Sequence, residues 1–185
     1  MNLKALEQSL RADVFDNVPD AQIVSQTDCW QYKTGVPINA PIAMGWFEND
    51  NILILNSDGV FIFDIQQNQF SHKDFDSTSH QNISGDNLTY AIFPGSERIS
   101  IFGLRGGGGI KLTKDNRWVL DICYLSWNVR VPRLINTKTN EYYYFDLKRN
   151  DFEGYIFVGI SNSENYFAIM GDGGIDIYSK VGIGT

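Results

Sequence analysis

Hydrophobic residues near the start of the chain recur with the period of a helix. Four apolar side chains are spaced at i, i+3, i+7 and one turn beyond, which predicts a helix over residues 2–16. Asn17 and Pro19 would end it. The apolar stripe is narrow, so we expect the helix to pack on the outside of a larger structure or to contact a partner. The four residues are Leu3, Leu6, Leu10 and Val14.

The stretch NILILNSDGVFIFD, residues 51–64, has the pattern of a complete β-hairpin. Apolar runs at 52–55 and 60–65 flank Asp58-Gly59, a pair typical of tight turns because both residues tolerate positive φ. Both runs are almost wholly apolar. A strand exposed on one face should alternate, so this pattern predicts strands that are buried on both faces.

The same pattern returns 114 residues later. GWFENDNILILNSDGVFIFD aligns without a gap on GISNSENYFAIMGDGGIDIY, so that Gly45 meets Gly159 and Asp58-Gly59 meets Asp172-Gly173. Such self-similarity predicts a repeated supersecondary unit. Because the Asp-Gly pair recurs, turn chemistry is the favoured role of Asp58, and the several oxygen ligands of a calcium loop are not found around it.

Weaker copies lie between these two. Their common theme is a loop with an acidic residue and Asn, an apolar strand, a turn rich in Gly or Asn, and a second strand. For the glycine run 106–109 we expect a hairpin turn or bulge, because neither Gly-Lys-Ser/Thr nor a helix follows, as a phosphate loop requires. Further strands are expected at 21–25, 30–33, 99–104, 110–112, 117–125, 129–135 and 142–145, with a turn at 136–140.

This rhythm resembles the blades of a β-propeller over roughly residues 43–180. The Trp-Asp and Gly-His signatures of WD40 repeats are absent. The resemblance implies an all-β fold of antiparallel, propeller-like hairpin repeats with one N-terminal helix, in a single domain over 1–185. A small closed propeller and a curved sheet or sandwich both remain open, because the chain has room for three or four blades at most.

Charge is unevenly distributed along the chain. The formal net charge is −7, and residues 1–100 carry five basic and thirteen acidic side chains, whereas residues 101–185 carry ten and nine. An acidic half repels nucleic acid and anionic membranes and attracts a basic partner. An acidic balance also serves solubility alone. The basic residues Lys111, Lys114, Arg117, Arg130 and Arg133, near Trp118 and Trp127, are too few against this balance to indicate a nucleic-acid surface.

The N-terminal sequence MNLKALEQSLRADVF lacks the apolar core of a signal peptide, and no apolar run is long enough to span a bilayer. We therefore expect a cytoplasmic protein without membrane association. In that compartment Cys29 and Cys123 would be free thiols. Cys123 lies in the apolar run VLDICYL and is expected in the core.

Residues 66–87 are expected to form a long acidic loop, because regular apolar patterning stops there. Long loops tend to be functional or disordered, and aromatic side chains among carboxylates suit a basic protein partner. This segment and its surroundings supply the expected partner-binding residues. They are Trp46, Glu48, Asp64, Phe70, Asp74, Phe75, Asp76 and Asp86.

Catalytic chemistry is only weakly indicated. The two histidines, His72 and His80, lie in this segment with Asp74 and Asp76 between them, but their spacing fits no structural zinc pattern. A nucleophile elbow, Gly-x-Ser-x-Gly, is absent. We therefore expect no enzyme, no cofactor and no metal, while a hydrolase acting through the histidines remains an alternative.

In size, acidity, absence of a leader and lack of catalytic motifs, the sequence resembles the immunity proteins of bacterial polymorphic-toxin systems, which serve contact-dependent inhibition or type VI secretion. The resemblance implies a cytosolic inhibitor that binds a cognate, basic, nuclease-type toxin domain and covers its active site. The alternative is a carbohydrate- or peptide-binding β module that uses Trp46, Tyr142 and Tyr143.

Overall fold

The computed structural model describes residues 22–24, 27–75, 81–93, 95–126, 129–145 and 154–182. They form an all-β fold, as the apolar runs predicted, and Glu48–Asp50 form a short 3-10 turn. The helix expected at 2–16 lies outside these residues. Nowhere does the described chain form a helix with the length and hydropathy needed to cross a bilayer. The strands are β1 (Gln22–Val24), β2 (Trp30–Val36), β3 (Pro41–Trp46), β4 (Ile52–Asn56), β5 (Gly59–Asp64), β6 (Gln69–Asp74), β7 (Thr89–Ala91), β8 (Arg98–Gly103), β9 (Trp118–Ser126), β10 (Val129–Asn136), β11 (Glu141–Phe145), β12 (Ile156–Ile160), β13 (Tyr166–Gly171) and β14 (Gly174–Lys180).

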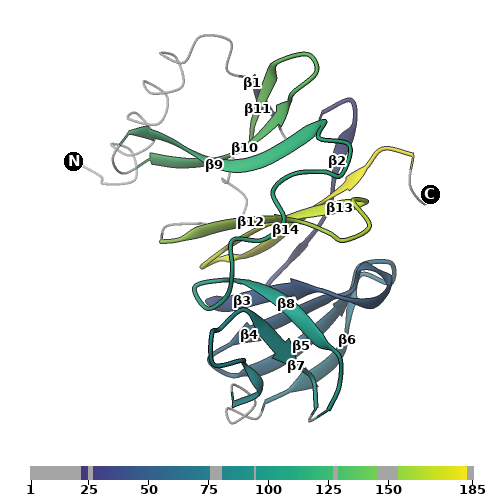
Figure 1. The fold of residues 1–185 in the computed structure, drawn as a ribbon, viewed down its shortest axis with the longest axis vertical. Helices are drawn as coiled ribbons and strands as arrows, with labels where there is room; N and C mark the ends of the chain where they lie inside the picture. Colours follow the sequence, from purple (N-terminus) through teal and green to yellow (C-terminus); the bar gives the residue numbers. More distant parts are fainter. Residues whose placement is uncertain are drawn as a thin grey trace.

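These strands form three open sheets that stack in a column (Figure 1). The six-stranded sheet has the order β6-β5-β4-β3-β8-β7, the central sheet β12-β13-β14-β2, and the upper sheet β1-β11-β10-β9. Neighbouring strands are antiparallel except β1 and β11. The early strand β2 therefore completes a sheet whose other strands come from the end of the described chain.

Two apolar layers hold the column together. Between the six-stranded and central sheets, Met44 and Phe61 belong to the same buried cluster as Met170. Between the central and upper sheets, an aromatic cluster is centred on Phe167 and Tyr178, whose stacked rings lie 4.6 Å apart. The central sheet is thus packed on both faces, which is the environment that continuous apolar strands require.

Strands β4 and β13 contain no exposed residue. In β4, Ile52 and Ile54 face the central sheet, whereas Leu53 and Leu55 join a third cluster on the opposite face of the six-stranded sheet, with residues of β7 and β8. The prediction of burial on both faces is therefore confirmed for the run 52–55, whereas in the run 60–65 Ile62 and Asp64 are half-buried.

The repeat recognised in the sequence corresponds to two similar meanders, β3-β4-β5-β6 and β12-β13-β14-β2. Gly45 and Gly159 are equivalent, but the β4–β5 hairpin pairs Asn56 with Gly59, and the β13–β14 hairpin pairs Gly171 with Gly174. The hairpins therefore correspond with a shift of 115 rather than 114 residues. Most positions of these strands are apolar, so a slip by one residue left the alignment looking equally good.

A six-residue turn with one hydrogen-bond pattern occurs three times, at 84–89, 113–118 and 161–166. The hydroxyl of the first residue accepts the N–H of the sixth, at 3.0, 3.0 and 3.2 Å. The side-chain oxygen of the third residue accepts the N–H of the fifth, at 3.0, 3.0 and 3.1 Å. The fourth residue has positive φ in each copy: Asn87, Asn116 and Glu164. This turn is the structural form of the expected loop with an acidic residue and Asn.

In two copies this turn changes the acidity of a carboxyl group. The Ser84 hydroxyl donates to Asp86 at 2.5 Å, and the Thr113 hydroxyl donates to Asp115 at 2.6 Å. These hydrogen bonds, followed by those from the backbone, hold the pKa of both carboxyl groups below its ordinary value.

Residues 104–112, here called the strap, cross one side of the column. Gly107 pairs with Phe102 of the six-stranded sheet, Ile110 with Ile160 of the central sheet, and Leu112 with Val119 of the upper sheet. The hairpin expected between 99–104 and 110–112 is therefore wrong, because β8 pairs with β3 and β7 instead. The glycine run lets the chain pass between sheets rather than turn back.

The long loop expected at 66–87 is also wrong, because β6 occupies its first half. β6 pairs with β5 as the edge strand of the six-stranded sheet, after a turn in which Asn68 has positive φ. Most of its side chains are exposed. A polar strand at the edge of a sheet lacks the apolar run that marks a buried strand, which explains why the sequence pattern missed it.

The two cysteines form no disulfide, as expected. Cys123, however, is half-buried rather than a core residue, because it lies on the face of β9 opposite to Leu120. Successive residues of a strand point to opposite faces, and only the Leu120 face packs against the central sheet.

Two glycines of the strap differ in what a side chain would meet, which makes a matched test of its packing. Gly109 has φ of +70°, and a Cβ there would lie 2.7 Å from the carbonyl oxygen of Val158. We expect Gly109→Ala to lower the free energy of unfolding by about 2 kcal/mol. A Cβ at Gly107 would have its nearest atom, Cδ2 of Leu88, 3.6 Å away. Gly107→Ala should therefore change the free energy of unfolding by less than about 0.5 kcal/mol. Urea denaturation measures both, and equal effects would contradict the packing described.

The recurring turn predicts an acid-range effect of Thr113→Val. Loss of the hydroxyl donor should raise the pKa of Asp115 toward its ordinary value, while Asp86 in the other turn keeps its lowered pKa. A carboxyl group whose pKa is lower in the folded state stabilises the fold at pH values above its unfolded-state pKa. This stabilisation is lost as the pH falls through the folded-state pKa. The variant should therefore lose stability less steeply below roughly pH 4. Carboxyl NMR titration checks both groups, and an unchanged Asp115 would count against the hydrogen bond.

Candidate partner-binding surface

The charges of the chain are separated between the sheets. Residues 41–103, which contain the strands of the six-stranded sheet, carry eight acidic side chains and two basic ones, Lys73 and Arg98, a net charge of −6. Residues 104–145, which contain the strap and most of the upper sheet, carry seven basic and three acidic side chains, a net charge of +4. The lower end of the column in Figure 1 is therefore the acidic end.

Exposed Asp58 and Phe75 and half-buried Asp74 lie at one corner of the acidic sheet and are here called the knob. A Cβ at Gly59 would lie 1.9 Å from the carbonyl oxygen of Asp74 and 3.0 Å from the Cα of Phe75, so the β4–β5 turn lies directly against the end of β6. The Phe75 side chain is 70% exposed, although its ring meets the buried ring of Phe61 edge-on at 5.4 Å. A supported but exposed phenyl ring beside two carboxylates suits a protein partner.

Asp58 was interpreted from the sequence as a turn residue, and its backbone has that role. The side-chain oxygen of Asn56 accepts the N–H groups of Asp58 and Gly59, at 2.9 and 3.1 Å. The Asp58 side chain is exposed to solvent, next to Gly59, whose Cβ position lies 3.0 Å from the Cα of Phe75. Only the antiparallel pairing of β5 with β6 brings Asp58 to Phe75, so no local sequence signal could have shown this.

Two of the expected aromatic contacts are parts of the core. Trp46 is 6% exposed and stacks on Tyr166 at 6.4 Å, so its assignment to a partner surface is wrong. Phe70 is half-buried between Phe61 and Phe63, with the Lys73 ammonium 4.7 Å above its ring. Aromatic residues on strands with one buried face are normally drawn into the core.

The expected carboxylates do not form one group. Asp64 pairs with Gln69 at one end of the β5–β6 hairpin, and Asp74 pairs with Val60 at the other. Four residues of strand separate them, about 14 Å. Asp64 is itself occupied, because it accepts the N–H of Gln67 at 2.9 Å.

The other expected residues are scattered. Glu48 is exposed in the 3-10 turn, and Asp86 is exposed in the turn at 84–89 described above. Asp76 lies outside the described residues. The structure therefore brings together only Asp74 and Phe75 of the expected set, and adds Asp58 to them.

An open depression of about 560 Å³ lies beside β7 and β8. Asn82, Gly85, Gly95 and Arg98 are among its lining residues. Arg98 is held in place by hydrogen bonds to the Thr89 hydroxyl at 2.6 Å and to the carbonyl oxygen of Asn82 at 3.2 Å. Its charge therefore supports the turn between β7 and the preceding segment.

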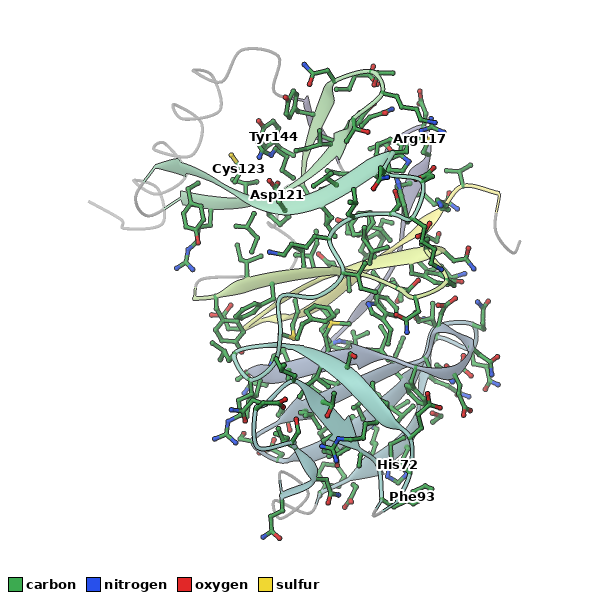
Figure 2. The ribbon with its side chains drawn as sticks, viewed as in Figure 1. His72, Phe93, Arg117, Asp121, Cys123 and Tyr144 are labelled. Atoms are coloured by element: carbon green, nitrogen blue, oxygen red, sulfur yellow. The ribbon has the colours of Figure 1, made fainter. Side chains whose placement is uncertain are left out.

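The described structure contains one member of the histidine pair. Figure 2 shows His72 at the edge of the six-stranded sheet, on the exposed strand β6, and His80 lies outside the described residues. Among the residues that the structure describes, no three His, Cys, Asp or Glu side chains are placed to hold a metal ion.

The upper sheet carries a half-buried ion pair on its outer face. Arg133 donates two hydrogen bonds to Asp121, at 3.0 and 2.7 Å, and these hold the pKa of Arg133 above its ordinary value. The guanidinium lies 5.6 Å from the ring centre of Tyr142, so that ring is covered. Asp121, Cys123 and Tyr144 lie on this sheet in Figure 2.

Tyr143 faces the other side of the upper sheet, where it packs against Trp118 at 6.2 Å. Burial, then a hydrogen bond to Glu141, raises the pKa of its hydroxyl. Tyr142 and Tyr143 therefore point to opposite faces and do not form one exposed platform.

Comparisons with protein-family models, curated proteins and solved structures give no match to this chain.

Proposed function

We propose that this protein is a cytoplasmic inhibitor of the immunity type, which binds a cognate basic toxin domain through its acidic six-stranded sheet and covers the active site of that domain. The separation of charge between the sheets carries this proposal. An excess of six negative charges over residues 41–103 supports steering of a basic partner toward one end of the column.

The knob supplies the contact that steering alone lacks. Charges at the rim of an interface mainly raise the association rate, whereas an aromatic side chain that enters a pocket on the partner slows dissociation. Phe75, braced on Phe61, is already oriented for such a contact. The exposed carboxylate of Asp58, on the adjacent turn, would meet the cations that a nuclease uses to hold phosphate groups.

We propose further that the fold is a propeller-like assembly of four repeats. The three copies of the turn at 84–89, 113–118 and 161–166, and the two equivalent meanders, support a common repeating unit. The strap residues Ile110 and Leu112 and the bridge at Ile83 would be remnants of first strands in the two weaker repeats.

The alternative, a carbohydrate- or peptide-binding module built on Trp46, Tyr142 and Tyr143, loses its support. Trp46 is buried, and the two tyrosines face opposite ways. A platform that stacks on a sugar needs an exposed aromatic face.

The first prediction concerns rescue from toxicity. Co-expression of this protein should restore growth to cells that produce the product of the neighbouring open reading frame, because masking of an active site abolishes the activity. Growth curves and co-purification of the two chains measure this. If the neighbouring product is not toxic, or if its toxicity persists, the immunity function is wrong.

The second prediction separates the knob from the rest of the surface. Asp58→Lys should slow association with the toxin on the order of ten-fold at low salt, because it reverses a steering charge. Phe75→Ala should raise Kd by roughly ten- to a hundred-fold, chiefly through faster dissociation. Surface plasmon resonance at low and high salt gives both rates.

Matched controls lie on the upper sheet. Glu141→Lys makes the same charge change at an exposed site, and Tyr124→Ala removes a side chain that is 67% exposed. Neither should change the rates more than about two-fold. Equal effects of the knob and control variants would show that the knob is not the contact.

A further inference from the structure

A second surface, distinct from the knob, lies along the strap. Of the large hydrophobic side chains that are exposed among the described residues, half lie here: Leu88, Leu104, Ile110 and Leu112, each between 45% and 55% exposed. Leu88 belongs to this surface because its Cδ2 lies 3.6 Å from the Cβ position of Gly107. The surface follows the teal segment that runs up the column in Figure 1.

The charge of this surface is opposite to that of the six-stranded sheet. Between Arg98 and Lys114 the chain has four basic residues and no acidic one. The side chains of Arg105 and Lys111 are exposed and form no hydrogen bond or ion pair with another described residue. The Lys111 side chain runs back along the strap, with its Cε 3.8 Å from the Cβ position of Gly108.

The backbone of the strap adds neutral donors. The N–H groups of Gly108, Gly109, Lys111 and Leu112 donate to no other described residue, while the carbonyl oxygens of Ile110 and Lys111 accept from Ile160 and Leu120. The N–H groups of Arg105 and Gly107 donate to the six-stranded sheet, whereas residues 108–112 meet the central and upper sheets through carbonyl oxygens and keep four unused N–H donors. Exposed N–H groups beside cations attract the carboxylate and carbonyl oxygens of another chain.

We propose that Leu88 and the strap bind an extended, acidic segment of a protein partner. Its aliphatic side chains would cover the four exposed ones, and its carboxylates would meet Arg105 and Lys111. Its carbonyl oxygens would accept the spare N–H groups. This surface goes beyond the proposed inhibitor function and does not depend on it, because the knob selects a partner of the opposite charge.

An anionic membrane is the less suitable occupant. Insertion of the strap would carry unpaired N–H groups into hydrocarbon, where each costs several kcal/mol, whereas a peptide chain satisfies them.

The test uses three sets of synthetic peptides on the full-length protein. The sets share alternating aliphatic positions and differ only in carrying Glu, Gln or Lys between them, and fluorescence anisotropy gives Kd at low and high salt. The Glu set should bind at least about ten-fold more tightly than the Gln set, with the difference lost at high salt, and the Lys set should not bind. Absence of binding by the Glu set would overturn the proposal.

Single-residue variants locate the binding. Lys111→Glu and Leu104→Ser should each weaken binding of the Glu set on the order of ten-fold. Lys33→Glu, at an exposed cation of β2, and Val181→Ser, at a side chain that is 52% exposed, are the matched controls and should leave Kd unchanged. Equal losses in test and control variants would overturn the proposal.

A vesicle measurement decides between the two occupants. Cosedimentation with phosphatidylserine-containing vesicles should not exceed that with neutral phosphatidylcholine vesicles. Binding to the anionic vesicles that Lys111→Glu abolishes would replace the peptide by a membrane and overturn the proposal.

Discussion

Burial of the central sheet on both faces is the constraint on which the rest of the structure depends. Strand β13 has no exposed residue, and both of its faces contribute to the two clusters that join it to the sheets above and below. Each fully buried large apolar side chain contributes about 1.5–3 kcal/mol through its removal from water. The six-stranded sheet has a further apolar cluster on its other face, but its contact with the rest of the column is made through the central sheet. The strap then crosses all three sheets at the side and keeps them in one order along the column.

The sequence could predict the all-β class, the principal hairpins and the burial of β4 and β13. Continuous apolar runs with Gly or Asp-Gly turns carry that information locally. The polar strand β6 could not, since pairing at a sheet edge needs no apolar side chains. The path of the strap depends on which strands lie nearby in space, and the glycines that permit it also suit a hairpin turn. The knob could not be predicted for the same reason, because the β4–β5 turn and the end of β6 come together only through the β5–β6 pairing. Trp46 was wrongly assigned because the sequence of a strand end is the same whether its aromatic side chain points into the core or into solvent.

The function proposed for this fold follows from where charge lies rather than from a catalytic group. Carboxylates gather on the six-stranded sheet, and cations gather on the strap and upper sheet. One end of the column is therefore negatively charged and the other positively charged, which the net charge alone does not reveal. A basic partner and an acidic one would therefore approach different parts of the molecule. The ion pair between Arg133 and Asp121 offers no charge to a partner, because each side chain already neutralises the other.

The place of β2 has a consequence for biosynthesis. Val36 pairs with Ile175, so a strand made early must wait for one made near the end of the described chain. Until β14 leaves the ribosome, Trp30 cannot pack with all the partners of its aromatic cluster. Pairing over such a sequence separation is slow. The emerging chain therefore has a long interval in which its most apolar strands are open to chaperones and to aggregation, and only synthesis of the last hairpin ends it.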